Sequence, residues 1–298
     1  MPVAVFDREA LGEAPNPLGM DGIEYVEYST KQPQALGQVL EAMGFKAVAR
    51  HRSREVLLYR QGGMNVVVNA HAGVLRSTLA TDDGAPRISA LAFRVRDARA
   101  AHERALALGA WEVAMHAHVM ELNIPGIHGP GGAHIYFVDR YRDFSIYSVD
   151  FTPIPGADPQ PEGTAGLHWF GIVQYIGSER TDDWVEFYHR LFGFVRLPQD
   201  TSFGILPKGT LLQSPQGGAT GFYLQLIEPD RATVVYDEQE LFHRIGFGTP
   251  DVPAAVAVLR GAGVDFIDTP PVRVTERGAI TRNALRSVVF ELVHDPRR

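Results

Sequence analysis

Residues 40–50 read LEAMGFKAVAR, and residues 188–198 read YHRLFGFVRLP. Both stretches combine the end of an amphipathic helix, a Gly-Phe turn and the start of a strand, and glycine suits such a helix end because it tolerates a positive φ. A second internal similarity relates RALALGA at residues 104–110 to AVLRGAGV at residues 257–264. The sequence therefore predicts four copies of one structural unit rather than two unrelated domains.

Each copy begins with an apolar strand, continues into a helix and ends in further strands. Asp97 and Asp251 precede two of the helices, where they would act as N-caps. Two βαβββ units pair into a half-open barrel whose interior can hold a ligand or a metal. The predicted fold class is α+β, with four βαβββ modules forming two half-open barrels. Opening strands are predicted at residues 22–29, 89–95, 167–175 and 242–248, helices at 33–43, 97–108, 181–191 and 251–260, and a closing strand of the second copy at 145–151.

The clearest break in the chain is the stretch TPIPGADPQPEG, where four prolines and two glycines disfavour both helix and sheet. We expect an N-terminal two-module barrel at residues 1–151, a linker at 152–163 and a C-terminal two-module barrel at 164–298.

Composition excludes several classes of function. The 298 residues include no cysteine, which rules out disulfides, thiolate metal sites and thiol nucleophiles. The net charge of −7 comes without a basic stripe, so no nucleic-acid partner is expected. No apolar run reaches the roughly 18 residues of a membrane span, so no membrane partner is expected either. The N-terminus lacks the features of a signal peptide, and a cytoplasmic location is predicted.

Three residues of the C-terminal half stand out as candidate metal ligands: His168, His243 and Glu291. Two imidazoles and one carboxylate form the facial triad that is typical of non-heme Fe(II) oxygenases. Each of the three begins or lies within a predicted strand, and strand-mounted ligands converge with little mobility. The repeat supports the choice, because the matching residues of the N-terminal half are not a ligand set: Glu24, Ser89 and, roughly, Ser148.

Long runs of the sequence resemble the 4-hydroxyphenylpyruvate dioxygenase family of the vicinal-oxygen-chelate superfamily. Those runs include NPLGMDGIEYVEYS, LEAMGFKAVARHRSREVLLYRQGGMNVVVN, AFRVRDARAAHERALALGA, WVEFYHRLFGF and VVFELV. The resemblance implies an N-terminal barrel without metal and a C-terminal barrel whose two histidines and one glutamate bind Fe(II). It also implies a small-molecule 2-oxo acid or aromatic substrate, O₂ as co-substrate and assembly into a homo-oligomer. Beyond the metal ligands it implies no catalytic residue.

The sequence departs from the family pattern in the C-terminal half. The chain ends seven residues after Glu291, where the family continues into a helix that covers the active site. Gly209 and Ile227 stand where a serine and an asparagine of the family contact substrate. Gln225 shares strand parity with Tyr223 and Ile227, and we expect these three residues to line the substrate pocket.

Two other functions stay open. An extradiol ring-cleaving dioxygenase shares the fold and the ligand set, although its additional histidine and tyrosine have no match here, and a catechol panel would test it. A non-catalytic family member that binds a metal or a ligand without turnover is the second alternative, and the altered pocket favours it.

Overall fold

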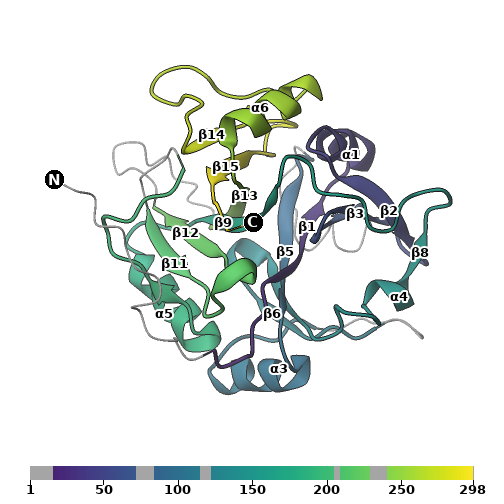
Figure 1. Cartoon of the computed structure of the whole chain (residues 1–298). Helices are drawn as coiled ribbons and strands as arrows, with labels where there is room; N and C mark the ends of the chain where they lie inside the picture. The colour runs from purple at the N-terminus through teal and green to yellow at the C-terminus, as the bar shows by residue number, and fades with distance from the viewer. Residues whose placement is uncertain (1–15, 72–83, 115–121, 205–208, 229–239, 298) are drawn as a thin grey trace.

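The computed structural model describes residues 16–71, 84–114, 122–204, 209–228 and 240–297. Two mixed sheets form its frame (Figure 1). The first sheet has the strand order β6-β7-β5-β1-β4-β3-β2-β8, and the second has the order β10-β11-β12-β9-β13-β15-β14. The strands of the first sheet are β1 Ile23–Ser29, β2 Lys46–His51, β3 Val56–Gln61, β4 Met64–Asn69, β5 Arg87–Arg94, β6 Gly126–His128, β7 His134–Val138 and β8 Phe151–Pro153.

The second sheet comes wholly from the C-terminal half. Its strands are β9 His168–Tyr175, β10 Val195–Arg196, β11 Thr210–Gln213, β12 Tyr223–Ile227, β13 Leu241–Thr249, β14 Gly278–Ile280 and β15 Phe290–His294. Each sheet curves around an interior of its own, and this arrangement confirms the predicted α+β fold with two half-open barrels.

The four predicted helices are present as α1 Pro33–Ala42, α3 Ala98–Ala107, α5 Thr181–Phe192 and α6 Val252–Gly261. Asp97 and Asp251 are N-caps, since each carboxylate accepts a hydrogen bond from the backbone N–H three residues later. Gly193 ends α5 in the left-handed conformation, with φ of 80°. The short elements are α4 Tyr147–Asp150, η2 Pro130–Gly132 and η3 Gly218–Thr220.

The two sheets contain β-bulges at matching places. On β1 the bulge falls at Glu24, and on β9 it falls at Phe170. On β5 the bulge falls at Ser89, and on β13 it falls at His243. Because a bulge changes which residues face the interior, these four positions fix how each half of the repeat presents its side chains.

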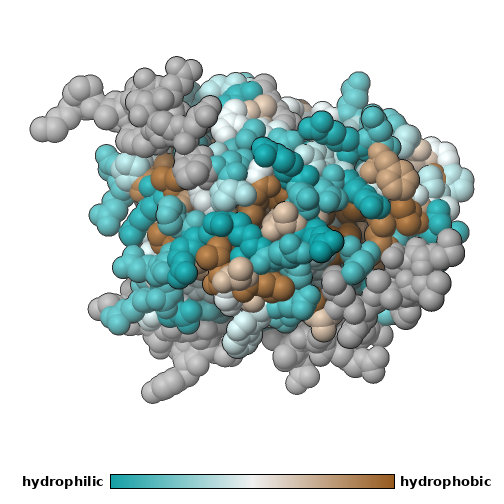
Figure 2. Space-filling model, turned by 90° about the horizontal axis from the view of Figure 1, so that it is seen from below, coloured by the Kyte–Doolittle hydropathy of each residue, from teal (hydrophilic) through white to brown (hydrophobic). Residues whose placement is uncertain are grey.

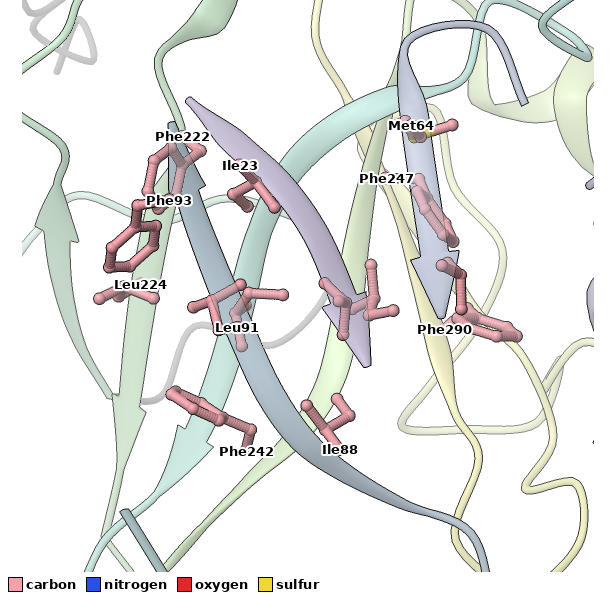
Figure 3. Packing of buried hydrophobic residues seen from close by; sticks show 14 of the residues in the cluster. Ile23, Met64, Ile88, Leu91, Phe93, Phe222, Leu224, Phe242, Phe247 and Phe290 are labelled. Atoms are coloured by element: carbon pink, nitrogen blue, oxygen red, sulfur yellow. The ribbon is translucent and has the colours of Figure 1, made fainter. Parts of the chain in front are cut away.

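One hydrophobic core joins the two sheets. Phe93 of β5 lies 5.5 Å from Phe222, measured between ring centroids, and 5.4 Å from Phe192 of α5. Figure 3 shows side chains of both sheets, such as Leu91 and Leu224, directed into the space between them. The outer faces of the two barrels are therefore packed against each other, and the barrel interiors lie on the opposite faces.

The structure corrects one predicted element and refines the boundary. Within residues 145–151, predicted as a strand, Tyr147–Asp150 form the helical turn α4, in which Tyr147 is buried against the barrel interior, and only Phe151 belongs to a strand. Strand β8 extends to Pro153 and pairs with β2, so the first residues of the predicted linker at 152–163 belong to the N-terminal sheet. Residues 1–15 of the predicted N-terminal domain lie outside the described residues.

The surface is mixed in character. On the face shown in Figure 2, apolar residues form a broken band between hydrophilic ones. Among the described residues, the large hydrophobic side chains with more than half of their surface exposed are Trp111, Phe144 and Val258. No helix in the described part of the chain is long and apolar enough to cross a membrane.

Candidate functional site

The interior of the C-terminal barrel is nearly filled by its own side chains. Phe170 of β9 and Tyr223 of β12 lie 5.0 Å apart between ring centroids, and Phe203 packs on both. The guanidinium of Arg297 lies 5.5 Å from the centroid of the Tyr223 ring. The remaining cavity, about 30 Å³, has room for one or two water molecules but not for an aromatic ring.

His168 lies at the start of β9, beside Gly248, where a Cβ would collide with the imidazole ring. Its Nδ1 is 3.0 Å from the carbonyl oxygen of Gly166, and its Nε2 is 3.1 Å from a carboxylate oxygen of Asp295. Burial would raise the pKa of Asp295, but hydrogen bonds from His168 and Arg297 outweigh it and hold that pKa well below its usual range. Both ring nitrogens of His168 therefore have partners within the protein.

His243 lies at the other end of the β9–β13 pair. Its ring stacks on Tyr175, with 4.1 Å between centroids and 8° between the planes. Burial, together with the nearby charge of Arg244, lowers the pKa of His243 to about 4. The bulge that contains His243 lies opposite the end of β9 near Val173, which is five positions beyond His168, and five positions correspond to roughly 16 Å along a strand. That separation is too large for the two imidazoles to share one metal ion.

Glu291 of β15 is held by a cation. Its carboxylate accepts a hydrogen bond from Nε of Arg244 at 3.1 Å, and both side chains are buried. The backbone of Gly204 covers another part of the carboxylate, because a Cβ at that position would collide with it. The glutamate therefore lies in an enclosed ion pair rather than at an open coordination site.

The strands beside Glu291 offer no substitute ligands. Its register partner on β13 is Gly246, which in turn pairs with Gly171 of β9. The other inward residue nearby is Arg244, whose guanidinium has no lone pair for a metal. No group of three His, Asp or Glu side chains close enough to hold a metal occurs among the described residues. The residues present thus do not fit an Fe(II) centre made of His168, His243 and Glu291.

Of the three residues expected to line a substrate pocket, the structure places two at one cavity and the third outside its lining. Tyr223 and Gln225 of β12 face the small cavity, together with Glu291. Ile227, at the end of the same strand, is not part of its lining. Two of the three residues thus face one cavity, and the space that they face is too small for the expected substrates.

The bulges also correct the match between the two halves of the repeat. His243 and Ser89 are equivalent bulge residues, as predicted. The equivalent of Glu24, however, is Phe170 rather than His168. Glu291 corresponds to Tyr136 rather than to Ser148, since Gly246 pairs with Glu291 as Ala92 pairs with Tyr136.

Sequence reasoning missed Arg244 as the partner of Glu291. The signal available was a charged residue within the otherwise apolar stretch RIGFG at residues 244–248. A charge there requires a partner in the barrel interior, because buried charges are almost always paired.

Comparison with known proteins relates the chain to one family. Residues 14–152 match the family model described as hydroxyphenylpyruvate dioxygenase, HPPD, N-terminal. The 4-hydroxyphenylpyruvate dioxygenase of Pseudomonas aeruginosa is 34% identical over 87% of this chain and 74% of that protein. Hemolysin VllY of Vibrio vulnificus is 35% identical over 87% of this chain and 75% of its own length. The 4-hydroxyphenylpyruvate dioxygenase of a Pseudomonas species is 40% identical, but the match spans only 60% of this chain and 50% of that enzyme.

Solved structures share the fold at lower sequence identity. A xylose isomerase-like TIM barrel/4-hydroxyphenylpyruvate dioxygenase fusion protein superposes with a TM-score of 0.72 at 24% identity, over 95% of this chain and 50% of the other. A mutant of 4-hydroxymandelate synthase from Streptomyces coelicolor gives a TM-score of 0.71 at 17% identity, over 93% of both chains. The relatives and the two-barrel vicinal-oxygen-chelate fold agree, and the chain therefore belongs to the 4-hydroxyphenylpyruvate dioxygenase family.

Proposed function

We propose that this chain is a small-molecule-binding member of its family that does not carry out iron-dependent oxygenation. The observation that carries the proposal is the buried pair of Arg244 and Glu291. The guanidinium is hydrogen-bonded to the carboxylate, and its positive charge disfavours the binding of Fe(II) beside it. The carboxylate that the resemblance assigns to iron thus has another partner.

The packing of the C-terminal barrel supports the same proposal. A substrate that chelates a metal needs open space beside the ligands, whereas this interior leaves about 30 Å³. Phe170, Phe203 and Tyr223 fill the barrel, and Arg297 covers two of their rings. In this proposal the C-terminal barrel stabilises the fold, and small molecules bind elsewhere in the chain.

A second candidate is the Fe(II)-dependent dioxygenase that the resemblance implies, with His168, His243 and Glu291 as ligands and a 2-oxo acid and O₂ as substrates. The likeness to two proteins named 4-hydroxyphenylpyruvate dioxygenase, at 34% and 40% identity, favours it. It requires Arg244 to leave Glu291 and the two imidazoles to converge from opposite ends of β9 and β13. Such a change would break the register of the sheet that joins those strands.

Iron binding separates the two candidates. Purified protein would be loaded with Fe(II) without oxygen, desalted and analysed for iron, and then assayed for oxygen uptake with 4-hydroxyphenylpyruvate and, separately, with catechol. We expect well under one iron per chain and no uptake above that of a Glu291→Ala control. A known 4-hydroxyphenylpyruvate dioxygenase treated in parallel shows that the loading works.

Stoichiometric iron that disappears in Glu291→Ala, together with substrate-dependent oxygen uptake, would reject the proposal and restore the dioxygenase. Uptake with catechol alone would instead favour the extradiol alternative. Assembly into a homo-oligomer and a cytoplasmic location follow from family membership as further proposals, and light scattering after size-exclusion chromatography tests the first of them.

A further inference from the structure

The N-terminal barrel, unlike the C-terminal one, contains a cavity large enough for a small molecule. Its volume is about 220 Å³, which is below the range of drug-sized pockets and suits a ligand of one ring. The cavity lies on the inner face of the first sheet, on the side away from the core that the two sheets share.

Two alanines on the middle strand keep the interior open. Ala92 of β5 lies in register between Tyr25 of β1 and Tyr136 of β7. Two residues earlier, Ala90 lies in register between Glu27 and His134. Because the central strand carries only methyl groups at these two positions, the longer side chains of β1 and β7 form two walls with space between them.

One wall carries a carboxyl group that is built into the barrel. Glu27 lines the cavity, and one oxygen of its carboxyl group accepts a hydrogen bond from the hydroxyl of Ser89 at 2.8 Å. Burial raises the pKa of Glu27, although hydrogen bonds from Ser89 and Asn69 and the charge of Arg54 oppose the rise. A carboxyl group held in this way is an acceptor with lone pairs left over, since an ionised carboxylate offers about four.

The opposite wall presents neutral polar groups. Nδ1 of His134 lies 3.1 Å from the hydroxyl of Tyr136. Burial, with a smaller contribution from His128, lowers the pKa of His134 to about 4, so the ring is uncharged at neutral pH. Burial likewise raises the pKa of Tyr136, which keeps its hydroxyl protonated.

The rest of the lining combines an apolar and aromatic part with further polar and charged side chains, which are His51, Arg54, Asn69, Asn123 and Asp150. Ile124, Ile146 and Phe151 contribute side chains to it, and Tyr147 packs against Phe151 with 5.6 Å between ring centroids. A ring compound buried here would contact hydrocarbon and aromatic faces on one side and the polar walls on the other, which is the usual composition of a small-molecule site.

We infer that the N-terminal barrel binds a small, uncharged ring compound that carries a hydroxyl group, and that this hydroxyl donates a hydrogen bond to Glu27. The inference rests on the small-molecule binding of the proposed function, to which it gives a site and a ligand class, but it does not depend on the absence of iron, because the cavity is separate from the C-terminal barrel. It would hold equally for a chain that bound iron.

Charge decides the class of ligand. A ligand carboxylate beside Glu27 would place two like charges in a buried site, which is strongly unfavourable. A ligand ammonium would compete with Arg54, which already supplies positive charge near Glu27. An uncharged hydroxyl needs no further countercharge and can donate to one of the lone pairs that the carboxylate has beyond its hydrogen bonds with Ser89 and Asn69.

The test compares three fluorinated rings of similar size by fluorine-detected NMR: 4-fluorophenol, 4-fluorobenzoate and 4-fluorobenzylamine. We expect the resonance of 4-fluorophenol to broaden and shift with added protein in a saturable way, and the other two to remain as in buffer. Equal responses from all three probes, or no response from the phenol up to its solubility limit, would overturn the inference.

Two variants assign any binding to this cavity. Glu27→Gln keeps the size of the side chain but replaces the charged acceptor, and we expect it to weaken binding of the phenol about tenfold or more. Gln225→Ala, at the small cavity of the C-terminal barrel, is the matched control and should leave binding unchanged. Melting curves establish that both variants are folded. Unchanged affinity in folded Glu27→Gln, or loss of binding in Gln225→Ala, would count against the site.

Discussion

At equivalent places in the two sheets, Ala90 of the N-terminal barrel corresponds to Arg244 of the C-terminal barrel. On the next strand, Tyr136 corresponds to Glu291. The frames are alike down to the positions of the bulges, yet one interior keeps a cavity of about 220 Å³ and the other keeps about 30 Å³. A repeated fold thus fixes where side chains point, while the size of the side chains at those positions decides whether the interior stays open or is filled, as Phe170, Phe203 and Tyr223 fill the C-terminal one.

The largest expected effect comes from breaking the pair that distinguishes the C-terminal barrel. Glu291→Ala leaves the guanidinium of Arg244 buried without its carboxylate, and we expect a loss of about 3–5 kcal/mol in the free energy of unfolding. The double variant Arg244→Met, Glu291→Leu removes both charges and should recover most of that loss. Denaturant unfolding measures all three proteins. A single variant as stable as the wild type would mean that the pair does not form.

A smaller effect of opposite sign is expected in the N-terminal barrel. Because burial raises the pKa of Glu27, its ionisation costs stability, and this cost appears as the pH rises above the value of about 4.3 of an unfolded glutamate. Glu27→Gln should therefore raise the melting temperature at pH 7, on the order of 2 °C, and by less at pH 4. Glu103→Gln, on the exposed face of α3, is the control. A fall in melting temperature at pH 7 would show that the ionised carboxylate stabilises the barrel.

The smallest effect compares one histidine from each barrel. The pKa values of His134 and His243 both lie near 4 in the folded chain, below the value of about 6.5 of an unfolded histidine. Above pH 6.5 both imidazoles are neutral in the folded and the unfolded chain, and their full contribution to stability is present. As the pH falls toward 4 this contribution is lost, because the unfolded chain binds more protons than the folded chain does. His134→Gln and His243→Gln should each flatten the pH dependence of the melting temperature in that range. An unchanged slope in either variant would show that the imidazole is not buried in solution.

Local features of the fold could be predicted from the sequence, because they depend on neighbouring residues. Asp97 and Asp251 cap their helices, and Gly193 ends α5, as the sequence indicates. The stretch at residues 145–151 was beyond such reasoning, since Tyr147 turns into the barrel interior as part of a helical turn. Tertiary packing decided that element, not its apolar pattern.

The candidate site was predicted less well, for a physical reason. A β-bulge adds one residue to one strand, and the sequence carries no clear sign of it. The bulges at Phe170 and His243 change the residues that face each other, so histidines spaced suitably in the sequence end roughly 16 Å apart along the sheet. Glu27 carried a better signal than either histidine, because it is one of two acidic residues, with Glu24, within the largely buried strand β1.

The aromatic contacts between the sheets have a thermodynamic consequence. Since Phe93 of one sheet packs on Phe192 and Phe222 of the other half, neither barrel can lose its structure without exposing the shared surface of both. The two halves should then melt in a single cooperative transition. A ligand held in the N-terminal barrel would raise the melting temperature of the C-terminal barrel as well, because binding to the folded state stabilises everything that unfolds with it.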